Sequence, residues 1–418
     1  MIGLIDGNNF YVSCERIFNL TLENRPVAVL SNNDGCVISR SNEFKALNIP
    51  MGTPYFQLKP LLGKYGLILK SSNYELYGDI SRRMIAVLNE FTPDVEQYSI
   101  DEAFIHLKLA AGAGYFEYGQ QIRHTILKWV GIPCGVGFAR SKTLAKIANH
   151  IAKKQPCGVF VMPDNSRAVL DNLPVSEVWG VGRRLAPKLE TLGLRSAWQL
   201  ASADETFLRK KFNVTLAKTA RELRGESVIE HEDPAELSQS ISCSRSFGRP
   251  VVDLSDLAEA VAHYISRAAV KLRKKGQRAS GVNVYFQYYP EYEPVKREGG
   301  FTGFTVTFER PTSATAEIIM AVSPKLKGIF IDGRRYKKAG VVFFGLESGN
   351  KRQMDLFADK IRDAKADRLA QAVDQINRRY GQGTLFNLAE GITKPWAMKR
   401  DLLTPCYTTN WEQILKVM

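Results

Sequence analysis

Residues 98–104 read Tyr98-Ser99-Ile100-Asp101-Glu102-Ala103-Phe104, so two adjacent carboxylates lie inside an apolar, strand-like run. A third carboxylate, Asp6, ends another apolar run at residues 2–6. Strand ends can bring distant acids to one point, and ionised carboxylates that close together are costly to bury unless a cation neutralises them. Acids without a paired His or Cys motif suit a hard, oxygen-preferring ion such as Mg²⁺. Spacing alone leaves the alternative open that these are unrelated strand-end acids facing water.

The bulk composition describes a globular protein with a polyanionic partner. The chain has 418 residues, which is too long for one typical core, and we expect three to five domains. Hydrophobic residues make up 44% and charged residues 24%, so the chain can bury an ordinary core. The net charge of the chain is +14. An acidic cluster in so basic a chain points to phosphoryl chemistry on an anionic polymer.

The cysteines and the apolar runs indicate a cytoplasmic protein. The six cysteines are scattered and include no CxxC pair, which argues against structural zinc and a disulfide scaffold and favours a reducing cytosol. We see no run of about 18 apolar residues, so we expect no membrane span and no membrane partner. The N-terminus lacks the basic start of a signal peptide.

Hydrophobic periodicity divides the chain into a mixed, a helical and a second mixed region. Residues 1–165 alternate strand-like and helix-like patterns, residues 166–232 predict short helices, 233–241 a linker, and 242–346 mixed α/β structure. Beyond 347 the chain is polar, with one helix and an irregular basic tail. The predicted strands are 2–6, 26–30, 95–107 (or a hairpin), 132–138, 281–288, 304–308 and 340–344, and the predicted helices are 81–91, one from Ser141, 257–273 and 365–380.

Further motifs accompany the acids in a fixed order. They are Phe10-Tyr11, Leu30-Ser-Asn-Asn-Asp-Gly-Cys-Val37, Ser72-Asn-Tyr-Glu-Leu-Tyr77, Gly135-Val-Gly-Phe-Ala-Arg-Ser-Lys142, Leu144-Ala-Lys146-Ile-Ala, Ser242-Cys-Ser-Arg-Ser-Phe-Gly248, Met398-Lys-Arg and Tyr407-Thr-Thr. Together with Asp6 and Ser-Ile-Asp-Glu-Ala-Phe, they resemble the Y-family translesion DNA polymerases over the whole chain. The resemblance is to the UmuC type, which covers the catalytic subunit of DNA polymerase V and its mobile-element relatives.

The resemblance implies a multidomain α/β (α+β) fold shaped as a right hand. Residues 1–165 would form the palm, with fingers inserted at about 20–75. Residues 166–232 would form a helical thumb with a helix-hairpin-helix, 233–241 a linker, 242–346 an α/β little finger, and 347–418 a C-terminal tail.

The resemblance also implies the catalytic roles. Asp6, Asp101 and Glu102 would be catalytic and hold two Mg²⁺ ions, with the Gly7 carbonyl as a further ligand. Tyr11 would be the steric gate beneath the sugar of the incoming nucleotide, with Phe10 packed beside it. From the residues alone, Tyr11 reads equally well as a packed aromatic at a strand-to-helix corner.

The nucleotide triphosphate needs cations, and the chain departs from the family here. Asn42 and Lys45 stand where the family places a Tyr and an Arg, and a lysine cannot make the bidentate contact of an arginine. Lys153 matches the family's palm lysine on the triphosphate. Lys142 and Lys146 share its helical stripe, and we expect both to lie on a solvated face.

Two regions are expected to bind the DNA backbone. Around Trp179, a Gly180-Val-Gly182-Arg183 turn predicts a hairpin whose N–H groups suit a phosphate, the alternative being a plain αα-hairpin. Lys274 and Lys275, in a basic cluster with Lys271, Arg273 and Arg278, are expected to grip the duplex. A second cluster comprises Lys325, Lys327, Arg334, Arg335, Lys337 and Lys338.

The resemblance therefore implies an error-prone polymerase of SOS-type damage tolerance, acting on primer-template DNA and dNTPs. The peptide Gln353-Met-Asp-Leu356-Phe357 resembles a sliding-clamp-binding motif. The resemblance further implies a processed UmuD-type dimer and RecA as partners.

Two rival functions are disfavoured by the residues. A DNA-binding scaffold without activity would lack one of the acids, and none is missing. The steric-gate aromatics and the basic clusters argue against a metal-dependent nuclease.

Overall fold

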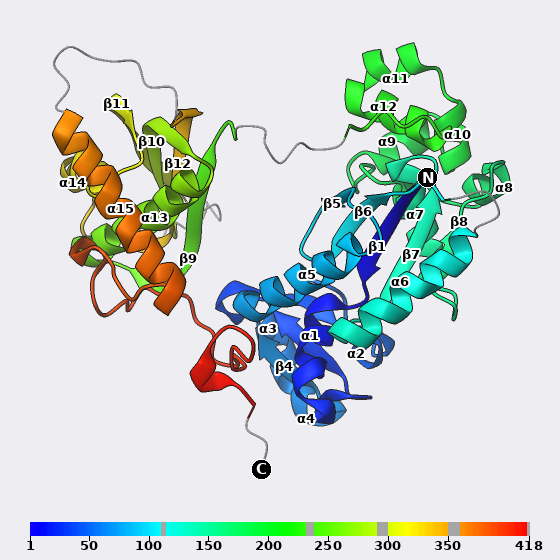
Figure 1. The fold of residues 1–418 in the computed structure, drawn as a ribbon, viewed down its shortest axis with the longest axis horizontal. Coiled ribbons are helices and arrows are strands. Elements are labelled where there is room, and N and C mark those ends of the chain that lie inside the picture. Colours follow the sequence, from blue (N-terminus) through cyan, green and yellow to red (C-terminus); the bar gives the residue numbers. More distant parts are fainter. Residues whose placement is uncertain (110–113, 231–237, 291–299, 350–359, 416–418) are drawn as a thin grey trace. The chain divides into compact units, whose positions relative to one another are not determined.

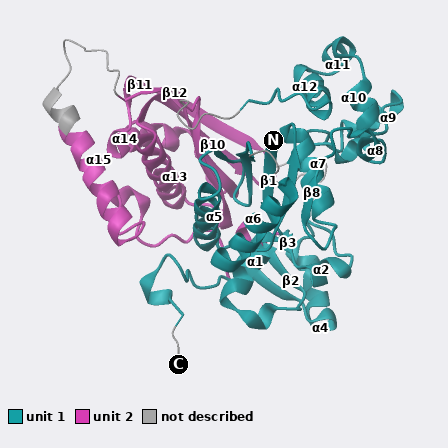
Figure 2. Ribbon diagram, turned by 45° about the vertical axis from the view of Figure 1, so that its right-hand side comes forward, with its two compact units in different colours: residues 1–31, 36–233, 402–418 teal, residues 32–35, 234–401 magenta. Residues whose placement is uncertain are grey.

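The computed structural model describes residues 1–109, 114–230, 238–290, 300–349 and 360–415, with side chains in the last range from Lys365 onward. The chain forms two compact units, coloured separately in Figure 2. The first unit comprises residues 1–31, 36–233 and 402–418, and the second comprises 32–35 and 234–401.

A five-stranded sheet is the centre of the first unit (Figure 1). Its order is β5-β6-β1-β7-β8, with the central strand β1 antiparallel to both neighbours. The predicted strand at 2–6, the hairpin at 95–107 and the strand at 132–138 are confirmed. The strands are β1 (Ile2–Gly7), β5 (Val95–Gln97), β6 (Glu102–His106), β7 (Cys134–Ala139) and β8 (Val159–Val161).

Helices cover both faces of this sheet because its strands are apolar on both sides. One face packs against α1 (Phe10–Phe18), α5 (Tyr74–Asn89) and α6 (Tyr115–Val130), and the other against α7 (Lys142–Ala152). Strand β7 and helix α7 approach closely at Gly137, where a Cβ atom would collide with the backbone of Asn149. The predicted helix start at Ser141 is also confirmed, since the Ser141 side chain caps α7 by accepting a hydrogen bond from the Leu144 N–H.

A smaller sheet of order β3-β2-β4 is inserted between α1 and α5. It contains the predicted strand at 26–30. Its elements are η1 (Leu20–Leu22), β2 (Val27–Leu30), β3 (Val37–Arg40), α2 (Asn42–Ala46), α3 (Tyr55–Leu58), η3 (Lys59–Leu61), α4 (Leu62–Tyr65) and β4 (Ile68–Ser71). The short turn η2 (Asn32–Asp34), between β2 and β3 in the sequence, belongs to the second unit.

Residues 166–225 form the short helices that the sequence predicts. They are α8 (Arg167–Asp171), η4 (Val175–Glu177), α9 (Ala186–Thr191), α10 (Ala197–Ser202), α11 (Glu205–Lys211) and α12 (Val214–Leu223). The buried carboxylate of Glu222 on α12 joins this region to α7, because it accepts hydrogen bonds from the N–H groups of Thr143, Val228 and Ile229.

The second unit is an antiparallel sheet of order β11-β10-β12-β9, packed against helices α13 and α14. The sequence predicts α13 and three of the strands, but it does not predict α14. The elements are β9 (Ile241–Val251), α13 (Leu254–Lys274), β10 (Gln277–Tyr288), β11 (Phe301–Thr312), α14 (Thr315–Ile329) and β12 (Tyr336–Ser348).

The chain ends in α15 (Lys360–Tyr380), which confirms the predicted helix at 365–380, and in two short turns, η5 (Leu388–Glu390) and η6 (Trp411–Gln413). Most of the predicted linker at 233–241 lies outside the described residues. Within the described ranges, none of the helices combines the length and the apolarity that crossing a bilayer requires. None of the six cysteines forms a disulfide there.

Candidate active site

The register of the central sheet brings the three predicted acids together. Asp6, at the end of β1, is the direct cross-strand partner of Glu102 on β6. The Gly7 N–H donates a hydrogen bond of 2.9 Å to the Asp101 carbonyl, which fixes the turn before β6 against the same strand end. The Ser99 hydroxyl donates to the Asp101 carboxylate at 2.6 Å and accepts from the Glu102 N–H at 3.0 Å. Strand pairing and one serine therefore hold all three acids at one edge.

Burial makes the negative charge at this edge unfavourable. Burial raises the pKa of Asp6 to about 7, against the lowering effect of Lys153, and the nearby charges of Glu102 and Asp101 raise it further. A carboxylate in these surroundings gains from any added positive charge.

Lysines supply that charge in this structure. Lys153 Nζ lies 2.6 Å from Asp6 Oδ1, and Lys146 Nζ lies 2.6 Å from Glu102 Oε2. Lys146 Nζ also lies 4.3 Å from the centre of the Tyr98 ring, a cation–π contact. The expectation that Lys142 and Lys146 face solvent is wrong. Lys142 is 2% exposed and bonds Glu96, because each lysine has a carboxylate partner on the sheet.

The donor set fits a divalent cation. Among the described residues, no three His, Cys, Asp or Glu side chains are grouped so that they could already hold a metal ion. The acids nevertheless converge with their charge opposed by lysine, and their oxygens are the donors that Mg²⁺ prefers. The residues of this site therefore fit the Mg²⁺ ions that the resemblance implies.

Tyr11 lies beside the acids in an aromatic cluster. Its ring stacks on Tyr77, with centres 4.6 Å apart and planes inclined at 17°, and meets the edge of Tyr74 at 5.9 Å. Burial, followed by the charges of Tyr74 and Asp101, raises the pKa of Tyr11 to about 12, so its hydroxyl stays neutral. Phe10 is 3% exposed and belongs to the core beneath, as expected for a packed neighbour.

The residues predicted to bind the triphosphate also converge. Lys45 Nζ donates to Asn9 Oδ1 at 2.6 Å, and Asn9 Nδ2 donates to Asn42 Oδ1 at 3.0 Å. Burial lowers the pKa of Lys45, and the charges of Arg40 and Lys153 lower it further while Asp6 raises it. Asn9 is the link that sequence reasoning missed, and its only signal was its place between the acid and the aromatic pair.

The predicted phosphate hairpin is present as a turn between η4 and α9. Gly180 has a φ of +86°, a conformation that favours glycine, and Arg183 is exposed. The first arm is a single 3₁₀ turn rather than a full helix.

The basic cluster after α13 divides into two groups. Lys274 and Lys275 are exposed, and Lys275 Nζ donates to Ser238 Oγ at 2.6 Å. Arg273 and Arg278 are instead ion-paired with Asp374 and Asp367 of α15, at 2.7 and 2.6 Å. The predicted clamp peptide, including Gln353, Leu356 and Phe357, lies outside the described residues.

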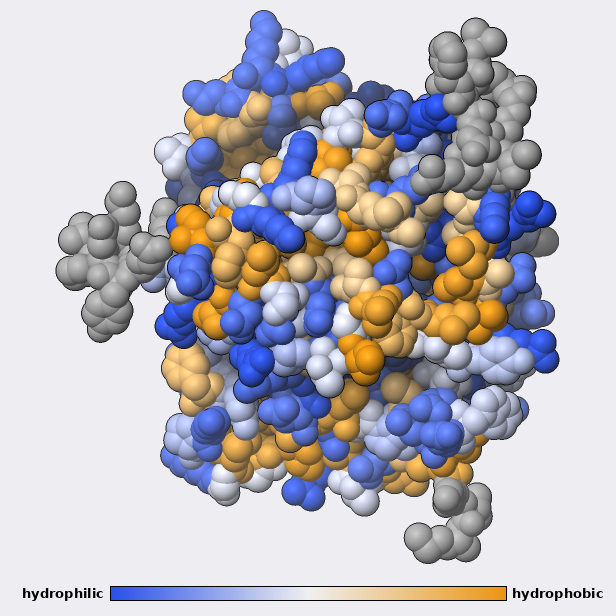
Figure 3. Space-filling view, turned by 90° about the vertical axis from the view of Figure 1, so that its left-hand side faces the viewer, coloured by the Kyte–Doolittle hydropathy of each residue, from blue (hydrophilic) through white to orange (hydrophobic). Residues whose placement is uncertain are grey.

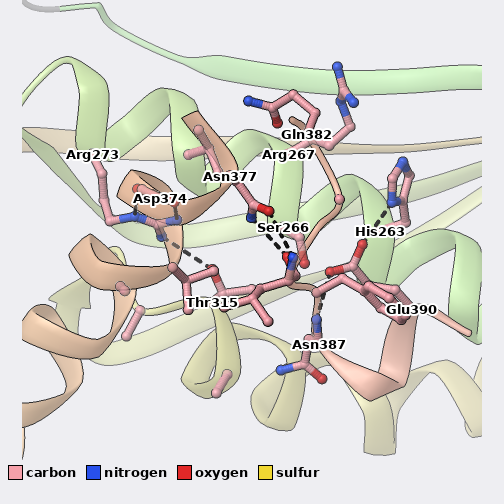
Figure 4. Close-up of a pocket in the computed structure, with 18 of the residues that line it drawn as sticks. His263, Ser266, Arg267, Arg273, Thr315, Asp374, Asn377, Gln382, Asn387 and Glu390 are labelled. Carbon is pink, nitrogen blue, oxygen red and sulfur yellow. Dashed lines mark hydrogen bonds and ion pairs between the residues drawn. The ribbon is translucent and has the colours of Figure 1, made fainter. Parts of the chain in front are cut away.

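A cavity of about 920 Å³ lies within the second unit, between α13, the start of α14, α15 and residues 382–394 (Figure 4). A hydrogen bond of 2.8 Å between His263 Nδ1 and Glu390 Oε2 and the ion pair of Arg273 with Asp374 mark its wall. The face shown in Figure 3 mixes hydrophobic and hydrophilic residues over short distances. The cavity is lined by residues of the second unit, whereas the three acids belong to the first.

Four family models match the chain. The impB/mucB/samB family matches residues 5–150, and its C-terminal domain matches 238–356. The IMS family HHH motif matches residues 163–194. A domain of unknown function, DUF4113, matches residues 367–417.

Proteins of similar sequence span the full chain. UmuC of Salmonella typhimurium strain LT2 is 43% identical over 423 residues, covering 100% of both chains. ImpB of Salmonella typhimurium is 41% identical, covering 99% of both. DNA polymerase IV of Desulfatibacillum aliphaticivorans is 30% identical over 91% of this chain and 94% of its own.

Solved structures share the fold at low sequence identity. A Y-family DNA polymerase chimera of Dbh and Dpo4 covers 83% of this chain and 100% of its own, with a TM-score of 0.65 and 20% identity. A Dbh ternary complex covers 82% and 99%, with a TM-score of 0.55. The architecture is that of a Y-family DNA polymerase, with palm, fingers, thumb and little finger, and the site lies in the palm sheet.

Within that class, the chain belongs to the impB/mucB/samB family and is of the UmuC type. It is a DNA-directed DNA polymerase of the kind that carries out translesion synthesis. The resemblance noted in the sequence and the predicted fold class are both confirmed.

Proposed function

We propose that this polymerase transfers nucleotides from dNTPs past damaged bases with Asp6, Asp101 and Glu102 as ligands of two Mg²⁺ ions. The observation that carries the proposal is the pairing of Asp6 with Glu102 across β1 and β6, where burial and neighbouring acids raise the pKa of Asp6. The Gly7 carbonyl would add a further oxygen ligand.

The residues of the site would position the reactants. Bound there, two Mg²⁺ ions would lower the pKa of the primer 3′-hydroxyl and neutralise the triphosphate. Ser99 orients the Asp101 carboxylate through its 2.6 Å hydrogen bond. Lys153 and Lys45 lie within one cluster, so their ammonium groups can pair with phosphate oxygens once a metal neutralises the acids. Asn42 would orient this group through Asn9. Placement and charge, rather than covalent chemistry, would then supply the catalysis.

Tyr11 would act as the gate against ribonucleotides. Its bulky ring, backed by Phe10, leaves space for hydrogen at C2′ and clashes with a hydroxyl. The stack on Tyr77 supports this role, because a ring packed against a second ring has little freedom to move aside.

Contacts to DNA and to partners complete the proposal. Gly180, Gly182 and Arg183 would contact the phosphate backbone at the hairpin, and Lys274 and Lys275 would contact it from the second unit. The boundaries of palm, fingers, thumb, linker, little finger and tail are proposed as the sequence predicts them.

The partners proposed are the sliding clamp, bound through residues 353–357, a processed UmuD-type dimer and RecA. Together with a cytoplasmic location and a role in SOS mutagenesis, they follow from the likeness to UmuC. A pull-down with each purified partner tests these contacts separately, and a partner that is not retained is removed from the proposal.

The decisive test of the metal site is Asp101→Asn. Loss of one ligand charge should lower primer extension with Mg²⁺ by at least on the order of a hundredfold, because the charge acts on the reacting groups. DNA binding, measured by fluorescence anisotropy, should stay close to wild type. The control is Asp164→Asn, an exposed aspartate whose partner is Arg140. Near-normal extension by Asp101→Asn would remove the assignment.

A further inference from the structure

The C-terminal residues 402–407 pack into the first unit as an ordered segment. The Leu402 N–H donates to Ser71 Oγ at 2.9 Å, and the Ser71 N–H donates to the Leu402 carbonyl at 3.1 Å, at the end of β4. Five residues later, the Tyr407 ring stacks on Phe18 of α1, with centres 4.8 Å apart. Both ends of the segment are therefore held. It lies within the match to the domain of unknown function, to which no role is assigned.

Thr404, at the centre of the segment, connects two helices. Asn73 caps α5 by accepting from the Leu76 N–H, and its amide donates to the Thr404 carbonyl at 3.0 Å and to Thr404 Oγ1 at 3.2 Å. The Thr404 hydroxyl in turn donates to Glu15 Oε1 of α1 at 3.1 Å. One hydroxyl therefore accepts from the cap of α5 and donates to a side chain of α1.

Glu15 passes this connection on to a tyrosine. Its side chain is 1% exposed, and the same Oε1 accepts a 2.6 Å hydrogen bond from the hydroxyl of Tyr77, which is 0% exposed. A buried carboxylate needs such donors, because an unsatisfied charge is strongly unfavourable away from water. The Tyr77 hydroxyl is held in place by the carboxylate that Thr404 also contacts.

Tyr77 is the ring on which Tyr11 stacks, at 4.6 Å. The path from the C-terminal segment to the sugar gate is thus Thr404, Glu15, Tyr77 and Tyr11, entirely within the first unit. Tyr74, which meets the edge of Tyr11, is carried by the same helix, whose cap the segment holds.

We propose that residues 402–407 are a positioning element for the sugar gate: by fixing Glu15 and Tyr77, Thr404 sets the place of the Tyr11 ring and so the discrimination between dNTPs and ribonucleotides. This inference rests on the proposed role of Tyr11. Thr404 is a positioning residue, because it does not touch the reacting atoms. A gate discriminates by contact with one hydroxyl, so a small shift of its ring changes the ribonucleotide rate more than the dNTP rate.

The test compares Thr404→Val with Thr404→Ser and Thr409→Val. Valine removes the hydroxyl and nearly keeps the shape, and serine keeps the hydroxyl. Thr409 is an exposed threonine two residues beyond the segment. Single-turnover kinetics measure kpol/Kd for dCTP and CTP opposite a template guanine. We expect Thr404→Val to lower the dCTP/CTP ratio about threefold to tenfold, with the dCTP value changed less than about twofold. Thr404→Ser and Thr409→Val should keep the wild-type ratio.

The Tyr11→Ala background separates this inference from the proposed function. Tyr11→Ala alone should lower the ratio, and Thr404→Val added to it should lower the ratio no further, because the ring through which it acts is gone. An unchanged ratio in Tyr11→Ala alone would overturn the gate itself. A lowered ratio in Tyr11→Ala with a wild-type ratio in Thr404→Val would overturn only the positioning role.

A purely structural role gives a different pattern. Thr404→Val would then lower dCTP and CTP incorporation by the same factor, together with the thermal unfolding midpoint, and would leave their ratio unchanged. That result also overturns the inference.

Discussion

Two lysines of helix α7 pack against the palm sheet, although lysines on most helices face solvent. Lys142 and Lys146 lie one turn apart on α7, and each ends on a carboxylate of the sheet. Lys142 and its partner Glu96 are 2% and 8% exposed, so water screens neither charge. A pair of this kind adds little net stability over an apolar pair, but the loss of one member leaves a buried charge.

Lys142→Met should therefore destabilise the protein strongly. The variant leaves the Glu96 carboxylate buried without its cation, which costs about 3–5 kcal/mol of unfolding free energy. Urea unfolding of Lys142→Met and of the exposed control Lys154→Met measures the difference. Adding Glu96→Gln to Lys142→Met should recover much of the loss, because the buried negative charge is removed. Equal stability of the two lysine variants would contradict the account.

At the residue scale, the sequence motifs predict which residues the fold brings together, but not the burial of charge. The proximity of Asp6, Asp101 and Tyr11 was predictable because motifs carry their positions, and their catalytic roles stay proposals. The burial of Lys142 could not be found, because helical spacing relates a residue only to its own helix. Its partner Glu96 is 46 positions away and meets it only when β5 joins the sheet.

Among the elements, the joint between α12 and α7 holds the thumb helices to the palm. The Glu222 carboxylate accepts from Thr143 in the first turn of α7 and from Val228 and Ile229 after α12. It satisfies the Thr143 N–H, which has no partner within α7, and lies at the positive end of that helix dipole.

Glu222→Gln should loosen this joint. The amide keeps the size and one acceptor oxygen but loses the charge and the second acceptor, so we expect a loss of about 1–3 kcal/mol. Hydrogen exchange should show faster exchange at Thr143, Val228 and Ile229, and chemical unfolding gives the total. The control is Glu226→Gln, whose exposed ion pairs with Arg221 and Arg224 are worth little. Unchanged exchange in Glu222→Gln would show that the carboxylate does not hold the joint.

Helices and strands could be predicted where the hydrophobic periodicity of the sequence is clear, and not where two periodicities fit equally well. The amphipathic spacing of α5 and α13 gave both helices, although each begins before the predicted start. Helix α14 was missed because it contains Pro324 and a run of β-branched residues, Ile318, Ile319 and Val322, which locally resembles a strand. Packing against the second sheet decides its conformation.

For the whole molecule, the return of the C-terminus to the first unit is the feature that local patterns could not show. Asn73 and Thr404 are separated by 331 positions and meet in a buried hydrogen bond. A tail that reads as irregular and polar has no periodicity to reveal its packing.

The net charge, in contrast, is visible from composition and predicts a property of the whole chain, its attraction to nucleic acid.

Replacing Lys274 and Lys275 by Ala should reduce the salt dependence of DNA binding. Each lysine that contacts a phosphate releases a counterion, so losing two contacts should lower the slope of log K against log salt by about 1.8. Both side chains are exposed, whereas Arg273 and Arg278 beside them are held by α15 and are not expected to contribute.

The control is the double variant Lys59→Ala with Lys64→Ala. It also lowers the net charge from +14 to +12, but it removes lysines that lie over Tyr55 and Tyr65. Anisotropy titrations of primer-template duplex from about 50 to 200 mM salt give the slopes. A slope lowered equally in both double variants would assign the effect to net charge, and a wild-type slope in the first would show that Lys274 and Lys275 only face solvent.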